Sequence, residues 1–402
     1  GTGSGTLSTG SGLYRPLDKQ RRDEVKPLEI TADFECANAE EIRREGDRSF
    51  SLSTRPDRAV DCEQYELADY YVAFRLINPN PQPVEAEVVY RELNYPETGR
   101  TLAVRDLFEN ELLVEDWRPL PREEVEIDAV KNSCRMRVTV QAEASLDVSS
   151  MYWMSGSQVY ERLGQVEGEK GVRVSSLGQT AQSREIPLIE LESRRKNAPL
   201  CALGATPQCH ELGTIAIMGI FEAALKGKLE GVLERCSLAL LPLSNPDGNA
   251  LGSCMTNALR QNVIFGFGAA GSGEGAVECE RVWDYLSRTR PLFFLEFHSY
   301  PHLNRPSFRP YDVDRALFPD DESRRRGETF FAAVNKVAPN PGVRLEAGSA
   351  IEKQFRPSLI SRLIADLGVP ATLYKLHNRE TVADNVDHSL QVLEGVATAM
   401  CR

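Results

Sequence analysis

The sequence is poor in histidine and tryptophan, with five and three of its 402 residues. It has no apolar run of the 18 or more residues that a membrane helix needs, which excludes a membrane span. No two of its nine cysteines have CxxC spacing, which excludes a zinc ribbon and a thioredoxin-like motif. An odd number of cysteines in a chain of this size favours reduced thiols in the cytoplasm. A cilium or another organelle is the alternative if a targeting segment has been removed.

Positive charge is also in short supply. Lysine and arginine number 47 against 59 aspartates and glutamates, and the net charge is −12. A nucleic-acid partner needs a face rich in lysine and arginine, so this charge argues against one. It argues equally against strong attraction to acidic protein tails. Hydrophobic residues make up 41% of the chain and charged residues 26%, which is typical of a globular protein.

The composition changes twice along the chain. Residues 1–28 form a Gly/Ser/Thr-rich tail followed by a charged arm, which has too little apolar surface to fold. Residues 29–155 carry β-rich or alternating stretches separated by turn signals and no long helical pattern. These stretches cover residues 51–54, 70–77, 84–90 and 134–141. We predict an N-terminal antiparallel β-sandwich domain over residues 29–155.

Residues 156–402 alternate between strand and helix patterns. Residues 238–243 and 292–297 are almost entirely apolar, as expected for strands buried on both faces of a mostly parallel sheet. Helical stripes of apolar residues cover 211–225, 357–367 and 390–400. We predict a mixed, mostly parallel α/β/α domain over residues 156–402.

Two parts of this second domain carry residues that bind metals. His298 follows the buried strand 292–297, at the edge where open α/β sheets bind their ligands. Glu211 stands at the start of a helix, and a catalytic zinc ion needs three protein ligands. The residue three before Glu211 is Gln208, a neutral amide and a weak zinc donor. Cys209 and His210 are alternatives, and we expect only one of the three side chains to face inward.

Four segments give the chain a family resemblance. They are PQCHE (207–211), NPDG (245–248), EFHSY (296–300) and ATLYK (371–375). Their order and spacing resemble those of the zinc metallocarboxypeptidases, specifically the cytosolic carboxypeptidase branch. The stretches ITADFECAN (30–38) and YYVAFRLIN (70–78) are similar to segments of that branch's N-terminal domain. The resemblance implies a β-sandwich joined to a peptidase domain, zinc as cofactor, and tubulin tails as substrate.

The metal-binding positions depart from the family pattern. The family's first zinc signature is H-x-x-E, and alignment on Glu211 puts Gln208 at the histidine position. We expect this signature nowhere else in the chain. His298 matches the third ligand. Gln208, Glu211 and His298 are therefore interpreted as a vestigial metal site, with no cofactor bound or a weakly held zinc ion.

The catalytic and substrate-binding positions depart as well. Met255 replaces the arginine that assists the scissile carbonyl, and Ile264 and Phe265 replace the Asn-Arg pair that grips the terminal carboxylate. The general-base glutamate is replaced by Tyr374 or Lys375, depending on one gap. Tyrosine at neutral pH cannot accept the proton of a metal-bound water, and a lysine ammonium repels the metal. No residue is therefore expected to act catalytically.

We predict a carboxypeptidase-like protein that has lost peptidase activity and serves as a binding or structural subunit. Its partner would be a protein, either tubulin or a larger assembly. One alternative is an enzyme with altered metal chemistry, built from His210, Glu211, His298, His302 and Cys209. The other is an active zinc carboxypeptidase that trims glutamates from tubulin, whose alignment differs from the one above.

Overall fold

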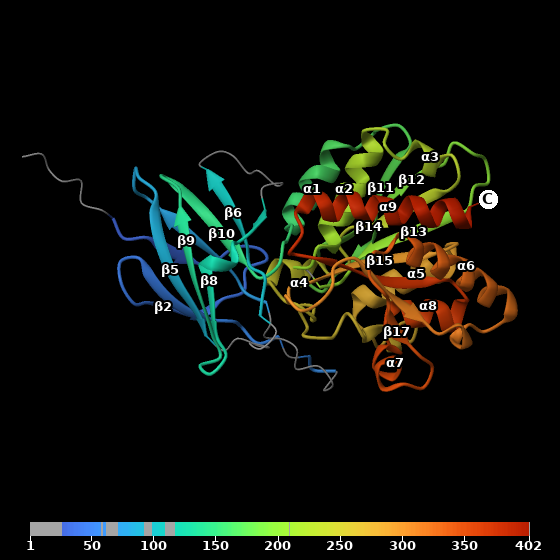
Figure 1. Ribbon diagram of the computed structural model, residues 1–402. Coiled ribbons are helices and arrows are strands. Elements are labelled where there is room, and N and C mark those ends of the chain that lie inside the picture. Colours follow the sequence, from blue (N-terminus) through green and yellow to red (C-terminus); the bar gives the residue numbers. More distant parts are fainter. Residues whose placement is uncertain are drawn as a thin grey trace, which may run out of the picture.

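The computed structural model describes residues 26–57, 59–61, 71–91, 99–108, 117–208 and 210–401. Two small β-sheets lie at one end of the molecule, and a large sheet with its helices lies at the other (Figure 1). The predicted tail, Tyr70 and Cys209 fall outside the described residues. Among the described residues, no helix is both long and apolar enough to cross a bilayer.

The two small sheets form the predicted β-sandwich. One has the strand order β1 (Glu29–Thr31), β4 (Ala73–Asn78), β10 (Ala144–Ser149), β6 (Ala103–Phe108), β7 (Arg118–Pro119). The other has the order β2 (Glu40–Arg44), β3 (Ser49–Ser53), β5 (Val84–Arg91), β9 (Ser133–Val140), β8 (Val125–Asp128). Alternate residues of β9 are buried, as a strand with one face on the core requires. The two sheets share one apolar cluster.

The sandwich is antiparallel, as predicted, except at one pair of strands. β3 and β5 run parallel, with Phe50 opposite Val88, whereas the other pairings between described strands of the two sheets are antiparallel. The reason is the connection between them. The chain passes from β3 through β4 in the other sheet before it returns to β5, and such a crossover joins parallel strands.

The large sheet is mixed and mostly parallel, as predicted. Its strand order is β11 (Val172–Gln179), β12 (Glu185–Leu191), β14 (Ser237–Leu241), β13 (Leu200–Ala205), β15 (Phe294–Tyr300), β18 (Ala371–His377), β16 (Arg309–Val313), β17 (Val343–Leu345). The four central strands β14, β13, β15 and β18 are parallel to one another. They bury almost all of their side chains, as strands covered on both faces do.

Helices cover both faces of the large sheet. They are α1 (Gly156–Gln165), α2 (Gly213–Leu225), α3 (Glu230–Leu233), α4 (Pro246–Leu251), α5 (Val277–Thr289), α6 (Asp321–Val337), α7 (Ala350–Phe355), α8 (Leu359–Leu367) and α9 (Val382–Met400). α2 packs against α9, and α5 packs against α8. Figure 1 shows α2 and α9 on one side of the sheet and α5 and α8 on the other.

Three predicted boundaries differ from the structure. The strand expected at 292–297 extends to Tyr300, so His298 lies within it rather than after it. The C-terminal helix begins at Val382, eight residues before the predicted start, because Thr381 forms a capping box with Asp384 ahead of the apolar stripe. The NPDG segment opens α4, since the Asn245 side chain accepts a hydrogen bond from the N–H of Gly248.

One apolar core joins the sandwich to the larger unit. Tyr71, Ala103 and Trp117 of the sandwich belong to the same buried cluster as the central strands of the large sheet. The indole N–H of Trp117 donates to the carbonyl of Trp153 at 3.1 Å. Arg105 is buried between these two tryptophan rings. Exposing these side chains to water would cost free energy in either part, and their burial therefore holds the sandwich against the large sheet.

Candidate functional site

The site lies at the carboxyl ends of β13, β15 and β18. His298 of β15 is the register partner of Lys375 of β18, and the two strands are parallel. Partnered residues in parallel strands project to the same face, so these two side chains share one face of the sheet. The loop after β13 supplies the third part of the site. Within that loop, the hydroxyl of Thr206 accepts a hydrogen bond from the N–H of Gln208 at 3.1 Å.

The structure brings together the three side chains predicted as a vestigial metal site. His298 Nδ1 lies 3.2 Å from Gln208 Oε1 and 3.1 Å from Glu211 Oε2. The other ring nitrogen, Nε2, lies 3.0 Å from a carboxylate oxygen of Glu296. All four side chains are buried. Of the three candidate ligands Gln208, Cys209 and His210, Gln208 is thus one whose side chain faces His298.

A fixed cation lies in the middle of this group. The ammonium of Lys375 is 3.3 Å from Glu211 Oε1 and 3.4 Å from Glu211 Oε2. It also donates to the carbonyl oxygen of Ser299 at 3.3 Å and lies over the ring of Tyr300. Lys375 is itself buried, with 7% of its surface exposed. An ion pair enclosed in this way is screened little by salt.

The carboxylate of Glu211 is held in its charged form. Burial by itself would raise the pKa of this group, but Lys375 and His298 oppose that effect, together with the hydrogen bond from the N–H of Ser299. The balance leaves the pKa of Glu211 below its usual value. Glu211 is therefore an anion whose charge Lys375 already neutralises.

This arrangement does not fit the zinc ion that the fold family uses. Catalytic zinc is held by three good donors, and this group offers one histidine, one carboxylate and the neutral amide of Gln208. The carboxylate already binds the ammonium of Lys375 through both of its oxygens. A divalent cation placed on Glu211 would stand within a few ångströms of that ammonium, where like charges repel strongly.

Of the residues in the altered-metal hypothesis, Glu211 contacts His298. The ring of His210 stacks on Tyr71 of the sandwich, with the ring centroids 3.2 Å apart, and burial holds its pKa well below the usual value. His302 is largely buried, which lowers its pKa to about 3. Cys209 lies outside the described residues. Within the described part of the chain, no group of three metal-ligand atoms within 4.8 Å of one another includes any of these residues.

Tyr374 and Lys375 take different directions, as neighbours in a strand do. The hydroxyl of Tyr374 lies 2.7 Å from Nε2 of His388, on α9. Of these two residues, it is Lys375 whose side chain contacts Glu211. Burial raises the pKa of Tyr374 far above its usual value and lowers that of His388 to about 4, so both groups are neutral at physiological pH.

The predicted substrate-binding positions are buried and apolar. Met255, Ile264 and Phe265 each expose 9% or less of their surface. The ring of Phe265 packs edge-on against Phe355 of α7, with centroids 5.5 Å apart. Asn262 fixes the turn, because its side-chain oxygen accepts hydrogen bonds from the N–H groups of Ile264 and Phe265. None of the three positions offers charge to a peptide carboxylate.

Two acidic side chains that precede β4, Asp57 and Asp61, bind this part of the chain, and no sequence motif marks them. The carboxylate of Asp57 accepts a 2.6 Å hydrogen bond from the N–H of Met255 and another from the hydroxyl of Thr256. Asp61 accepts a 2.8 Å hydrogen bond from the N–H of Asn262. Acidic side chains thus bind the backbone of the segment where the family carries its substrate arginines.

The expectation that no H-x-x-E signature occurs elsewhere in the chain, where Glu211 has Gln208 at the histidine position, is wrong, because His377 precedes Glu380 by three residues. The structure gives this pair separate partners. His377 Nε2 lies 3.0 Å from the carbonyl oxygen of His302, and its Nδ1 accepts a 2.8 Å hydrogen bond from the N–H of Arg379. The Glu380 carboxylate accepts from the hydroxyl of Ser307. Both ring nitrogens are in use, and the spacing has a structural role here.

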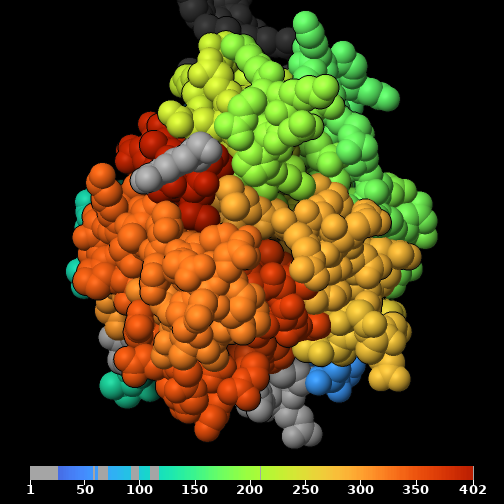
Figure 2. Space-filling model, turned by 90° about the vertical axis from the view of Figure 1, so that its right-hand side faces the viewer, coloured from blue at the N-terminus to red at the C-terminus, as the bar shows by residue number. Residues whose placement is uncertain are grey.

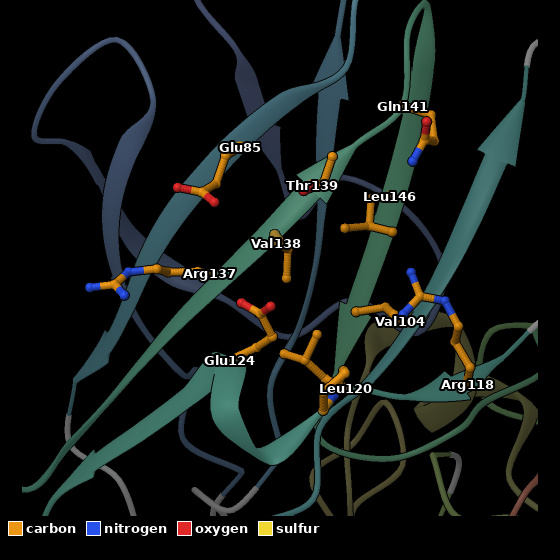
Figure 3. Close-up of a pocket in the computed structure, with 11 residues that line it drawn as sticks. Glu85, Val104, Arg118, Leu120, Glu124, Arg137, Val138, Thr139, Gln141 and Leu146 are labelled. Carbon is orange, nitrogen blue, oxygen red and sulfur yellow. The ribbon is translucent and has the colours of Figure 1, made fainter.

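Two cavities lie away from this site. One, of about 160 Å³, opens between the two sandwich sheets, where Figure 3 shows Glu85, Glu124 and Arg137 on one side and Arg118 on the other. The second, of about 650 Å³, lies between α1, α2 and α9 and is lined largely by apolar side chains. Neither cavity is lined by Gln208, Glu211 or His298.

Comparisons with known proteins support the fold. No protein-family model matches the sequence, and no curated protein matches it. Among solved structures, a metallo-carboxypeptidase from Pseudomonas aeruginosa aligns with a TM-score of 0.73 and 17% identity, covering 92% of this chain and 98% of that one. A metallo-carboxypeptidase from Burkholderia cenocepacia aligns with a TM-score of 0.72 and 15% identity, covering 93% and 98%. The chain therefore has the metallo-carboxypeptidase fold over almost its entire length.

Proposed function

We propose that this chain is a carboxypeptidase-fold protein that does not hydrolyse peptide bonds and that acts as a binding or structural subunit. The observation that carries the proposal is the ammonium of Lys375 on both carboxylate oxygens of Glu211. Hydrolysis needs a base that accepts a proton from the attacking water. Lys375 is the β18 residue beside His298, and an ammonium paired with a carboxylate has no free lone pair to accept that proton.

Loss of substrate contacts supports the same proposal. A peptide with a free C-terminus carries a carboxylate, which proteins hold with arginine through paired hydrogen bonds. Met255, Ile264 and Phe265 supply apolar surface instead, and Asp57 adds a negative charge beside them. A free C-terminal carboxylate would be repelled here. A neutral peptide segment or an internal loop of a partner fits this chemistry better.

The partner we infer is a protein in the cytoplasm. The resemblance to the cytosolic carboxypeptidase branch makes tubulin one candidate and a larger assembly another. Tubulin tails are rich in glutamate, and this chain has a net charge of −12. Repulsion between like charges therefore favours the larger assembly.

The test is a peptidase assay on the purified chain. Peptides ending in glutamate, in a basic residue or in an apolar residue are incubated with the protein and added zinc, and products are identified by mass spectrometry. We expect no release of C-terminal residues. Release that stops on chelation and is lost in Glu211→Gln would overturn the proposal and establish an active zinc carboxypeptidase.

A gain-of-function variant provides the matched comparison. Gln208→His and Lys375→Glu together restore a second histidine ligand and remove the ammonium from Glu211. We expect this double variant to bind zinc at least about 10-fold more tightly than the wild-type site, because a stronger donor replaces the amide and the repulsion is gone. Equal zinc affinity of this site in the wild type and in the double variant would show that Lys375 and Gln208 do not decide metal binding.

A further inference from the structure

Three buried cysteines from distant parts of the sequence meet at one point. Cys201 belongs to β13, Cys236 immediately precedes β14, and Cys401 immediately follows α9. Their sulfur atoms all lie within 4.8 Å of one another. Their exposed fractions are 0%, 0% and 3%. Nothing in the carboxypeptidase-like site requires these residues.

The spacing of the sulfurs matches that of a metal centre. A zinc–sulfur bond is about 2.3 Å long, so two thiolates on one tetrahedral ion stand about 3.8 Å apart. The sulfurs of Cys201 and Cys401 are 3.7 Å apart. The remaining separations do not exceed 4.8 Å. Closing all three onto one ion therefore takes movements of about 1 Å or less, within the reach of side-chain rotation.

The surroundings act differently on the three thiols. Hydrogen bonds from the thiols of Cys201 and Cys236 lower the pKa of Cys401 to about 4, and the guanidinium groups of Arg195 and Arg235 act in the same direction. Burial raises the pKa of Cys201 far above its usual value. Hydrogen bonding to Cys201 lowers the pKa of Cys236, but hydrogen bonding to Cys401 and burial outweigh it and raise this pKa to about 12. Binding a metal would displace the protons of the remaining thiols.

We propose that Cys201, Cys236 and Cys401 form a binding site for one thiophilic metal ion with a filled d shell, either zinc or copper(I). Three thiolates are soft ligands, which these ions prefer and which magnesium and calcium reject. Three sulfurs complete the coordination of copper(I), and zinc would take a fourth ligand from solvent. The two arginines offset part of the excess negative charge.

The cysteine cluster and the carboxypeptidase-like site lie at opposite ends of the parallel strands of the large sheet. Cys201 and Cys236 are at the amino ends of the parallel strands β13 and β14, whereas His298 is near the carboxyl end of β15. A bound ion would fasten the end of α9 to the two strands. Figure 2 shows the C-terminal part of the chain, in dark red, reaching the surface between the yellow-green and orange segments.

The test uses the full chain, reduced and freed of metal by a chelator. It is titrated separately with zinc, copper(I) and magnesium, with cobalt(II) as a spectroscopic substitute for zinc. We expect one zinc or one copper(I) per chain, a thiolate-to-cobalt charge-transfer band, release of protons and a rise in the thermal midpoint. Magnesium should give none of these.

Variants assign the site. Cys401→Ser changes a residue that follows the last helix, so the fold should persist, as circular dichroism will verify. We expect it to lose the charge-transfer band and at least about 100-fold in affinity, more than the loss of an outer hydrogen bond to a metal ligand causes. Cys134→Ser removes another buried thiol, from the sandwich, and should bind like the wild type.

Two results would overturn the proposal. One is unchanged binding by Cys401→Ser, which would place the metal elsewhere. The other is failure of the reduced protein to bind either ion, combined with a disulfide among the three cysteines that mass spectrometry finds in the protein before reduction, which would make the cluster a redox pair. His298→Ala is included so that metal at the carboxypeptidase-like site is counted separately. It follows that one zinc per chain in the wild type does not by itself indicate peptidase chemistry.

Discussion

Replacing Lys375 by methionine is the most direct perturbation of the carboxypeptidase-like site. Methionine has a similar length and shape, so the change removes the ammonium with little loss of packing. At 3.3 Å and an effective dielectric constant near 20, the attraction between Lys375 and Glu211 is about 5 kcal/mol. Removing one partner of a buried pair leaves the other charge uncompensated, which costs about 3–5 kcal/mol.

We therefore expect Lys375→Met to lower the free energy of unfolding by about 3–5 kcal/mol, measured by urea denaturation at neutral pH. Lys353→Met provides the control, because Lys353 is exposed on α7 and its loss should change the stability by less than about 0.5 kcal/mol. Glu211→Gln in the Lys375→Met background should recover part of the loss, since it removes the uncompensated anion.

The double-mutant cycle is the decisive measurement. If the two side chains interact as the distances indicate, the sum of the single losses exceeds the loss in the double variant by about 2–3 kcal/mol. Additivity within about 0.5 kcal/mol would refute the ion pair, and with it the reason for excluding zinc from this site. A decrease of less than about 1 kcal/mol in the free energy of unfolding of Lys375→Met alone would also refute the ion pair.

The remaining predictions concern the surrounding structure. Burial lowers the pKa of His377 to about 4, so between pH 6.5 and 4 the unfolded chain binds a proton at this residue that the folded chain does not. As pH decreases over that range, this residue alone should lower the free energy of unfolding by about 3 kcal/mol. His377→Gln should remove this contribution from the pH profile measured by urea denaturation. Asp57→Ala should cost about 1–3 kcal/mol by leaving the N–H of Met255 unpaired, with faster hydrogen exchange at that amide. Tyr374→Phe should lower the free energy of unfolding by about 1 kcal/mol, because it removes the hydrogen bond to His388. Added to the Gln208→His, Lys375→Glu variant, Tyr374→Phe should leave the metal affinity unchanged.

Sequence reasoning located the site because its parts follow a fixed order along the chain. Glu211 follows β13 and His298 lies near the carboxyl end of β15, and the carboxyl ends of these neighbouring parallel strands meet at one edge of the sheet. It could not decide between Tyr374 and Lys375, because that choice depends on the register of β18 against β15. One residue of slip reverses which side chain faces the site.

Other features have no local signal at all. The contact between Asp57 and Met255 joins segments 198 positions apart, and it depends on how the sandwich packs against the large sheet. The sulfurs of Cys201 and Cys401 are 200 positions apart and have none of the short spacings by which metal sites are recognised. Such pairs become visible only once the tertiary structure is known.

Because Tyr71, Ala103 and Trp117 are buried in the same apolar core as the large sheet, we expect the sandwich and the large sheet to unfold together. A recombinant fragment starting near residue 156 would carry the complete carboxypeptidase-like site. It would nevertheless expose to water the broad apolar surface that the sandwich normally covers. Such a surface promotes aggregation. Truncation is therefore a poor way to study this site, and point variants in the intact polypeptide are the appropriate tools.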